Sequence, residues 1–191
     1  MDLDALFNHY GSDKTRNGYA PVYHSLFKNL KNNKLSLLEI GIGTMIPGVH
    51  SSMVGYSLEG YRPGGSLRAW RDYFPNGEIL GADVQPDTQF TEDRIKTILC
   101  DSTSSEAVLG SFKDKSFDII IDDGSHWDEN QLKTLRNLYK YVKTGGYYIV
   151  EDVYPNSRMS GPFLDEVKKI CDDGLLYLTE KKNLIIISKR F

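Results

Sequence analysis

The 191-residue sequence is poor in cysteine, has no long apolar run and carries little excess of either charge. Its two cysteines, Cys100 and Cys171, are far apart and fit neither a disulfide framework nor a zinc-binding motif. No run approaches the roughly 20 apolar residues of a membrane span, and the first residues include no hydrophobic signal segment. The formal net charge of -3 predicts no general attraction to nucleic acid or to an anionic membrane. We therefore expect a soluble, cytoplasmic, single-domain protein with no nucleic-acid or membrane partner.

The sequence does contain short apolar runs that alternate with longer helical patterns. This alternation predicts strand–helix repetition around a mainly parallel sheet. The apolar runs predict strands at 35–42, 78–84, 95–100, 117–122, 146–152, 175–180 and 183–189. The helical patterns predict helices at 66–74, 104–112, 129–142 and 161–173. The short link at 181–183 implies that the last two strands form an antiparallel hairpin.

Five parallel strands closed by an antiparallel hairpin are typical of the class I methyltransferase fold, a Rossmann-like α/β fold with helices on both faces of a seven-stranded sheet. A Rossmann dehydrogenase has six parallel strands instead. Residues 10–27 and 44–65 lie outside this pattern, before and after the first strand. A loop as long as 44–65 is usually functional or disordered in a compact domain. We interpret residues 1–34 as a cap over the cofactor or substrate and 44–65 as an insertion that is a candidate lid.

Glycines or acidic residues stand at the ends of the first three predicted strands: Gly41 and Gly43, then Asp83, then Asp101 and Ser102. In open α/β sheets ligands bind beyond the carboxyl ends of the strands. Asp83 stands where a carboxylate usually binds a ribose diol, and Asp101 and Ser102 stand where a loop can contact an adenine ring. Any single acid could instead be a helix N-cap or a solvated loop residue. Three consecutive strand ends of this kind favour a nucleoside cofactor.

The sequence has no G-x-G-x-x-G motif, and no helix begins directly after the first strand to bind a pyrophosphate. This counts against NAD and favours S-adenosylmethionine, which has no phosphates. Glu39 at the end of the first strand, Ser12 in the leading segment and Ser66 at the start of the first predicted helix complete the expected cofactor-binding residues.

Acidic residues also end the next two strands, Asp122 and Asp123 on the fourth and Glu151 and Asp152 on the fifth, and His126 follows the first pair. Neighbouring parallel strands open on the same crevice, so Asp123, Glu151 and Asp152 can converge. Without a cation, three carboxylates would repel one another and raise each other's pKa. An all-oxygen ligand set favours Mg²⁺ or a similar ion over zinc. Asp122 is interpreted as a turn residue or a cofactor contact.

Methyl transfer from a sulfonium to an alcohol needs an oxygen nucleophile that is losing its proton. A metal makes the hydroxyl more acidic and orients it. His126 can act as the general base, because imidazole titrates at about pH 6.5. The plainer alternative is a surface turn at Asp123 and Gly124, with Ser125 as the N-cap of the next helix. Because both acid pairs end buried strands at one predicted edge of the sheet, the functional interpretation is favoured.

Four sequence blocks resemble the metal-dependent sugar O-methyltransferases of macrolide biosynthesis, of the mycinamicin and macrocin type. They are IDDGSH (121–126), VEDVY (150–154), and the segments 10–27 and 64–84, and the 28 residues between Asp123 and Glu151 match that family's spacing. The resemblance covers residues 10 to about 152. It implies Mg²⁺ ligands at Asp123, Glu151 and Asp152, a base at His126, and a cofactor site that includes Glu39, Asp83 and Asp101. Catechol-type methyltransferases usually have lysine at the position of His126, so the histidine favours a sugar acceptor.

Tyr56, Tyr61 and Trp127 would suit stacking on a sugar ring, although packing explains tyrosines in a loop equally well. Lys14 and Tyr19 could reach the methionine end of the cofactor with Ser12, and Lys14 could equally be solvated.

The expected function is S-adenosylmethionine-dependent and Mg²⁺-dependent methyl transfer to a sugar hydroxyl of a glycan or glycosylated metabolite. The alternatives are a catechol-like or other small-molecule O-methyltransferase, a nucleotide-dependent oxidoreductase, and a non-catalytic cofactor-binding module. The sequence itself does not fix the oligomeric state, and the resemblance allows a homo-oligomer, because members of that family tend to be oligomeric.

Overall fold

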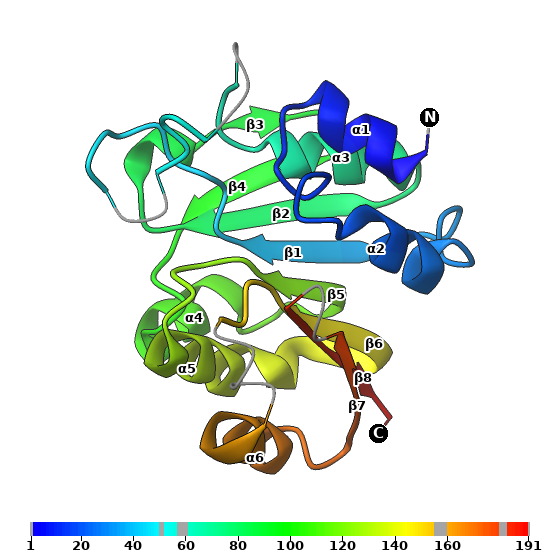
Figure 1. Cartoon of the computed structure of the whole chain (residues 1–191), viewed down its shortest axis with the longest axis vertical. Coiled ribbons are helices and arrows are strands. Elements are labelled where there is room, and N and C mark those ends of the chain that lie inside the picture. The colour runs from blue at the N-terminus through cyan, green and yellow to red at the C-terminus, as the bar shows by residue number, and fades with distance from the viewer. Residues whose placement is uncertain (1, 50–51, 57–60, 155–159, 180–182, 191) are drawn as a thin grey trace.

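A computed structural model of the chain describes residues 2–49, 52–56, 61–154, 160–179 and 183–190. These residues form one eight-stranded sheet in the order β3-β4-β2-β1-β5-β6-β8-β7 (Figure 1). The strands are β1 (Ser36–Ile40), β2 (Glu78–Asp83), β3 (Thr91–Glu92), β4 (Ile95–Leu99), β5 (Phe117–Asp122), β6 (Val142–Val150), β7 (Gly174–Thr179) and β8 (Leu184–Lys189). The helices are α1 (Leu3–His9), α2 (Ala20–Phe27), α3 (Gly65–Tyr73), α4 (Ser105–Phe112), α5 (Asp128–Leu138) and α6 (Gly161–Ile170), with short 3₁₀ turns η1 (Pro86–Thr88) and η2 (Tyr139–Tyr141).

The sheet has the predicted mixed topology. Strands β4, β2, β1, β5 and β6 run parallel to one another, and β8 is antiparallel to both β6 and β7. The α/β fold class and the C-terminal hairpin are therefore confirmed, although most of the predicted link at 181–183 lies outside the described residues. The eighth strand, β3, is a two-residue edge strand antiparallel to β4. It is too short to leave an apolar run in the sequence.

Alternating strand residues supply two cores, one on each face of the sheet. On one face, Leu37 and Ile121 pack with residues of α1, α2 and α3. On the other, Leu38 and Ile120 pack with residues of α4, α5 and α6. Both faces of the sheet are therefore covered by helices (Figure 1). A ligand can reach the sheet at the ends of its strands.

Two predicted boundaries are wrong in the same region. The helix expected at 129–142 ends at Leu138, and Val142 already belongs to β6, which was expected to begin at 146. After Val142 the next four residues of β6 are Lys143, Thr144 and two glycines, so they leave no apolar run. Glu151 and Asp152 nevertheless follow β6 directly.

The leading segment contains helices α1 and α2, which the sequence pattern did not predict. Each spans only seven or eight residues, which gives the helical period little length in which to repeat. Both helices are fixed to α3 by aromatic packing around buried Trp70, whose ring meets Phe7, Tyr23 and Phe27 at centroid distances of 4.9, 5.1 and 6.1 Å. The loop between α1 and α2 is thereby held over the sheet. No helix in the described ranges is long and apolar enough to cross a membrane.

Candidate functional site

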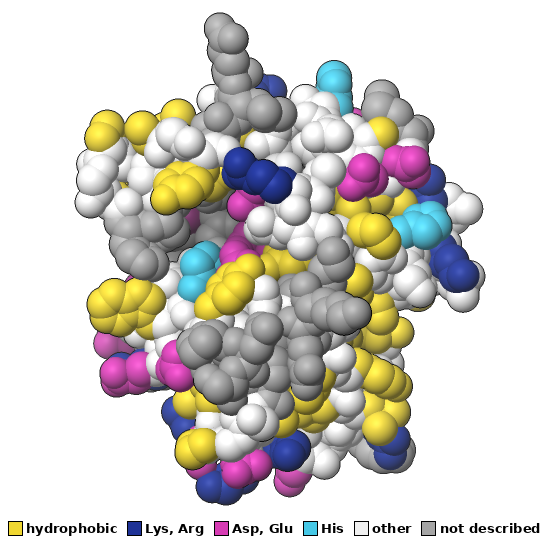
Figure 2. Space-filling view, viewed as in Figure 1, with side chains coloured by type: hydrophobic (Ala, Val, Ile, Leu, Met, Phe, Trp, Pro, Cys, Tyr) yellow, Lys and Arg dark blue, Asp and Glu magenta, His cyan; other side chains and the backbone are white. Residues whose placement is uncertain are grey.

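A cavity of about 840 Å³ opens beyond the carboxyl ends of β1, β2, β4, β5 and β6. Acidic and histidine side chains are visible at a hollow on this face of the molecule (Figure 2). Most of the residues predicted from the sequence line this cavity: Ser12, Gly41, Gly43, Ser66, Asp83, Asp101, Ser102, Asp123, His126 and Asp152. Glu39 and Glu151 are not among the lining residues, and each is almost fully buried.

The end of β1 bends sharply because Gly41 and Gly43 have φ of 84° and 83°, which favours glycine. A Cβ on Gly41 would lie 1.9 Å from the carbonyl oxygen of Asp123, and one on Gly43 would lie 2.3 Å from the hydroxyl of Tyr61. The backbone of β1 thus approaches the β5 loop more closely than any side chain allows. Both glycines line the cavity at this close approach.

Asp83 and Asp101 line the cavity and also order their own loops. Asp83 accepts hydrogen bonds from the backbone N–H groups of Ile42 (2.7 Å) and Gln85 (2.9 Å), and burial raises its pKa. Asp101 accepts from the N–H and hydroxyl of Thr103. The N-cap of α4 is Ser104, not Asp101. The helix-cap alternative for Asp101 is therefore wrong.

Three serines line this side of the cavity: Ser12 in the leading segment, Ser66 on α3 and Ser102 after β4. Ser12 and Ser66 are each 8% exposed. The hydroxyl oxygen of buried Ser102 lies 2.9 Å from that of Thr134 on α5. The cavity wall is thus continuous from the leading segment to α5.

Asp123, His126 and Asp152 form the group that could hold a metal ion. One ligand atom from each lies within 4.8 Å of the other two. The Nε2 atom of His126 is 3.9 Å from Asp123 Oδ1 and 3.7 Å from Asp152 Oδ2. His126 and Asp152 also have left-handed backbones, with φ of 59° and 51°. Such conformations are uncommon for residues other than glycine and gather at functional sites.

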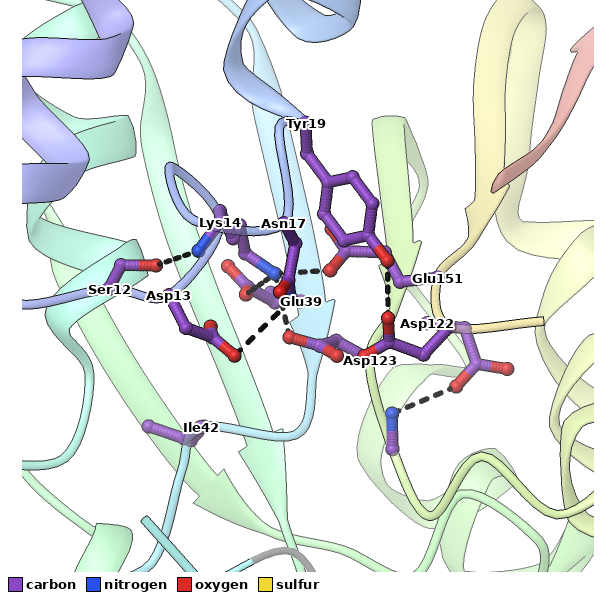
Figure 3. Close-up of polar contacts among 12 residues, drawn as sticks. Ser12, Asp13, Lys14, Asn17, Tyr19, Glu39, Ile42, Asp122, Asp123 and Glu151 are labelled. Carbon is purple, nitrogen blue, oxygen red and sulfur yellow. Dashed lines mark hydrogen bonds and ion pairs between the residues drawn. The ribbon is translucent and has the colours of Figure 1, made fainter. Parts of the chain in front are cut away.

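Glu151 lies behind this group, next to a buried lysine that the sequence did not place here. The Nζ atom of Lys14 is 2.6 Å from Asp123 Oδ2, 2.7 Å from Glu151 Oε2 and 3.2 Å from Glu39 Oε1 (Figure 3). The other oxygen of Glu151 accepts a hydrogen bond from the hydroxyl of Tyr23. Lys14 is 1% exposed, so the alternative that it is solvated is wrong.

Charge in this region is unbalanced toward the negative. Burial raises the pKa of Asp123, and the Glu151 carboxylate raises it further. Burial also raises the pKa of Glu151, to about 7, despite the opposing effect of Lys14. Burial alone would lower the pKa of Lys14, but Asp123, Glu151 and Glu39 outweigh it and raise that pKa. A divalent cation fits this donor set, because hard oxygen ligands with excess negative charge are what such ions prefer.

Glu39 contacts protein groups rather than the cavity. Its Oε2 accepts a hydrogen bond from the indole nitrogen of Trp70 (2.8 Å), and its Oε1 faces Lys14. Neither Lys14 nor Tyr23 shows a local signal for this position, since Asp123 and Glu151 lie more than 100 residues away from them in the sequence. Only the basic and aromatic content of residues 10–27, which the family resemblance marked, could have indicated them.

Among the proposed acceptor-binding aromatics, Tyr56 and Tyr61 line the cavity, whereas Trp127 is 63% exposed and is not among the lining residues. The Tyr61 hydroxyl donates to the carbonyl oxygens of Ile42 and Gly43, at 3.2 and 3.3 Å. Part of the candidate lid, residues 50–51 and 57–60, lies outside the described residues.

No family model matches the chain. A tetracenomycin-C rhamnosyl 3'-O-methyltransferase of Streptomyces olivaceus is 37% identical over 159 residues, which cover 80% of this chain and 37% of that protein. The mycinamicin VI 2''-O-methyltransferase of Micromonospora griseorubida is 33% identical over 161 residues, covering 80% of this chain and 36% of that protein. The demethylmacrocin O-methyltransferase of Streptomyces fradiae is 32% identical over 156 residues, covering 80% of this chain and 36% of that protein.

Solved structures show the same relationship. The MycE methyltransferase from the mycinamycin biosynthetic pathway, in complex with Mg and SAH, superposes with a TM-score of 0.79 at 27% identity, covering 100% of this chain and 55% of that one. The chain thus spans little more than a third of the curated relatives and about half of the solved one. It has the class I methyltransferase fold, and it is a homologue of the sugar O-methyltransferases of the mycinamicin and macrocin type.

Proposed function

We propose that this chain transfers a methyl group from S-adenosylmethionine to a sugar hydroxyl of a glycosylated metabolite or glycan, in a reaction that depends on a divalent cation. The observation that carries the proposal is the group of Asp123, His126 and Asp152 at the mouth of the cavity, with ligand atoms within 4.8 Å of one another. The relatives are named as methyltransferases that act on sugar hydroxyls of glycosylated compounds, and MycE has been solved with Mg, SAH and mycinamycin VI.

In this proposal the cofactor occupies the part of the cavity between β1 and β4. Gly41 and Gly43, at the bend after β1, line this part of the cavity. Asp83 is the proposed partner of the ribose diol, and Asp101 and Ser102 border the adenine. Ser12 and Ser66 border the methionine end. Glu39 acts on this side indirectly, since its carboxylate contacts Trp70 and Lys14.

The proposed metal ligands are Asp123, Glu151 and Asp152. Asp123 and Asp152 each direct one oxygen toward His126. Both oxygens of Glu151 contact Lys14 or Tyr23, but a carboxylate oxygen has two lone pairs, so these contacts leave it able to bind an ion. When bound, a divalent cation would make a nearby alcohol more acidic.

His126 is the proposed general base. Its ring is partly exposed at the cavity, and Nε2 faces the two aspartates where an acceptor hydroxyl would be held. The cavity supplies the alignment of hydroxyl, methyl carbon and sulfur on which methyl transfer depends. Tyr56 and Tyr61 lie on the wall where they can contact the acceptor.

The test is methyl transfer from labelled S-adenosylmethionine to a panel of glycosides, in matched reactions with EDTA and with EDTA followed by excess Mg²⁺. We expect labelled product from at least one glycoside, loss of the label with EDTA and its recovery with Mg²⁺. Transfer that is indifferent to chelation would remove the metal from the proposal. Calorimetric binding of NAD in preference to S-adenosylmethionine would favour an oxidoreductase instead.

A further inference from the structure

The loop between α1 and α2 carries two buried polar side chains into the carboxylate group. Lys14 and Tyr19 are each 1% exposed, and both come from a short turn closed by a hydrogen bond from the N–H of Tyr19 to the carbonyl of Lys14 (2.9 Å). In Figure 3 the Lys14 ammonium lies among the carboxylates of Glu39, Asp123 and Glu151, and the Tyr19 ring points toward the same cluster of acids. The leading segment is therefore part of the wall of the candidate site.

Tyr19 fixes one of the two oxygens of Asp152. Its hydroxyl donates to Asp152 Oδ1, and the remaining oxygen, Oδ2, is the one 3.7 Å from Nε2 of His126. Asp152 itself has a left-handed backbone, with φ of 51°. The phenol therefore selects one orientation of a carboxylate whose backbone is already constrained.

Lys14 has the same relation to Asp123. Its ammonium contacts Asp123 Oδ2, which leaves Oδ1 on the side of His126 at 3.9 Å. The turn that carries Lys14 and Tyr19 thus binds one oxygen of each aspartate, Asp123 Oδ2 and Asp152 Oδ1. The other oxygen of each aspartate, Asp123 Oδ1 and Asp152 Oδ2, faces Nε2 of His126.

Packing does not explain the hydroxyl of Tyr19. The ring meets Tyr23 edge-on at 6.4 Å, and Tyr23 in turn meets Trp70 edge-on at 5.1 Å. Phenylalanine would fill the same space in this buried aromatic stack. The only atom it would lack is the one that contacts Asp152.

We propose that Tyr19 is a positioning residue that acts through Asp152, orienting its Oδ2 toward the cation site. This inference rests on the proposed metal-dependent function and assigns to the leading segment a direct role in metal affinity. Hydrogen-bond partners of metal ligands typically change metal affinity by about 10- to 100-fold when they are removed.

The test is calorimetric titration of Mn²⁺ into the 191-residue chain without cofactor or acceptor, comparing the wild type with Tyr19→Phe. Mn²⁺ is the probe because it prefers oxygen ligands as Mg²⁺ does. The matched control is Tyr73→Phe, which removes a hydroxyl from an equally buried ring whose partner is His24, away from the acids. Unfolding temperatures are measured for all three proteins.

We expect Tyr19→Phe to bind Mn²⁺ about 10-fold or more weakly, with an unfolding temperature close to that of Tyr73→Phe. In methyl transfer, the Mg²⁺ concentration for half-maximal rate should rise similarly, while the rate at saturating Mg²⁺ changes less. Unchanged Mn²⁺ affinity in Tyr19→Phe would overturn the inference. Equal losses of affinity and stability in both variants would also overturn it, because they would indicate a structural effect. If the wild type binds no Mn²⁺, the proposed metal-dependent function fails first, and the inference fails with it.

Discussion

Strand β5 carries carboxylates at both of its ends, and the two ends differ in how their charge is matched. At the amino end, Asp118 accepts hydrogen bonds from the backbone N–H of Ser36 (2.7 Å) and from Lys143 (2.8 Å). Its side chain is 31% exposed. Burial raises the pKa of Asp118, but Lys143 and Ser36 outweigh it and leave that pKa below its ordinary value.

At the carboxyl end, the acids outnumber the cations. Lys14 is the ammonium placed among Asp123, Glu151 and Glu39, and Asp152 is close by with Tyr19 as its partner. The pKa of Asp123 and that of Glu151 are raised there rather than lowered. The described cations therefore match the charge of Asp118 at the amino end of β5, whereas Asp123, Glu151, Asp152 and Glu39, at the carboxyl ends of β5, β6 and β1, outnumber the cation described among them. That excess distinguishes a cation site from an ordinary ion pair.

The largest expected effect of a single change falls on His126. Replacing it by alanine should slow methyl transfer by about 10²- to 10⁴-fold, the usual contribution of a general base. His126→Asn is a useful second variant, because asparagine tolerates the left-handed backbone at this position. Steady-state rates and calorimetric affinity for S-adenosylmethionine should both be measured. Affinity near that of the wild type is expected, and its loss together with the rate would mean that His126 has a structural role.

The contrast between the two ends can be measured directly with Lys14→Met and Lys143→Met. Removing Lys14 leaves buried carboxylates without their cation, so the free energy of unfolding in EDTA should fall by about 3 to 5 kcal/mol. Removing Lys143 breaks a partly exposed pair with Asp118 and should cost less than about 1 kcal/mol. Urea unfolding monitored by circular dichroism gives both values. Equal losses would show that the two ends are electrostatically alike.

A smaller effect, one that depends on pH, is expected at Asp122, the last residue of β5. Burial raises its pKa to about 7. A carboxyl whose pKa is raised by folding stabilises the folded state most at low pH, and this contribution is lost as pH rises through 7. Between pH 5 and 8 the wild type should lose about 2 to 3 kcal/mol of stability from this group.

Asp122→Asn has no such titration, so its stability relative to the wild type should increase by that amount from pH 5 to pH 8. Urea unfolding at the two pH values, in EDTA, measures the difference. Asp118→Asn is the control at the other end of the strand. A constant difference between Asp122→Asn and the wild type would contradict the raised pKa.

The sequence predicted the sheet well because its strands read as apolar runs, most clearly β1, β5 and β8, whose residues are buried on both faces. Each run from 35–42 to 183–189 corresponds to a strand, and the acids that follow the runs lie at one edge because parallel strands share an edge. The predicted boundaries of helices and strands are wrong where the chain is polar, as in the first half of β6. Strand β3 was missed because two residues leave no apolar run, and helices α1 and α2 were missed because they are short and lie outside the strand–helix alternation of the sheet.

The candidate site was predictable only as far as each residue could be placed at a strand end. Asp123, His126 and Asp152 were expected together and lie together. The role of Lys14 could not be predicted, because a lysine in a polar loop is usually solvated and its partners are distant in sequence. The Glu151 carboxylate is oriented by its contacts with Lys14 and Tyr23. Because both partners are distant in sequence, the sequence pattern could not predict this orientation.

The proposed cation site is tested most directly by equilibrium binding of Mn²⁺ to the wild type, Asp123→Asn and Asp118→Asn. These variants make the same change at opposite ends of β5. One ion per chain should bind to the wild type and to Asp118→Asn with similar affinity, and Asp123→Asn should weaken that binding by about 100-fold or more, since a direct ligand is expected to matter at least as much as its hydrogen-bond partners. Binding to Asp123→Asn as tight as to the wild type would contradict a cation site at the carboxyl end of the sheet.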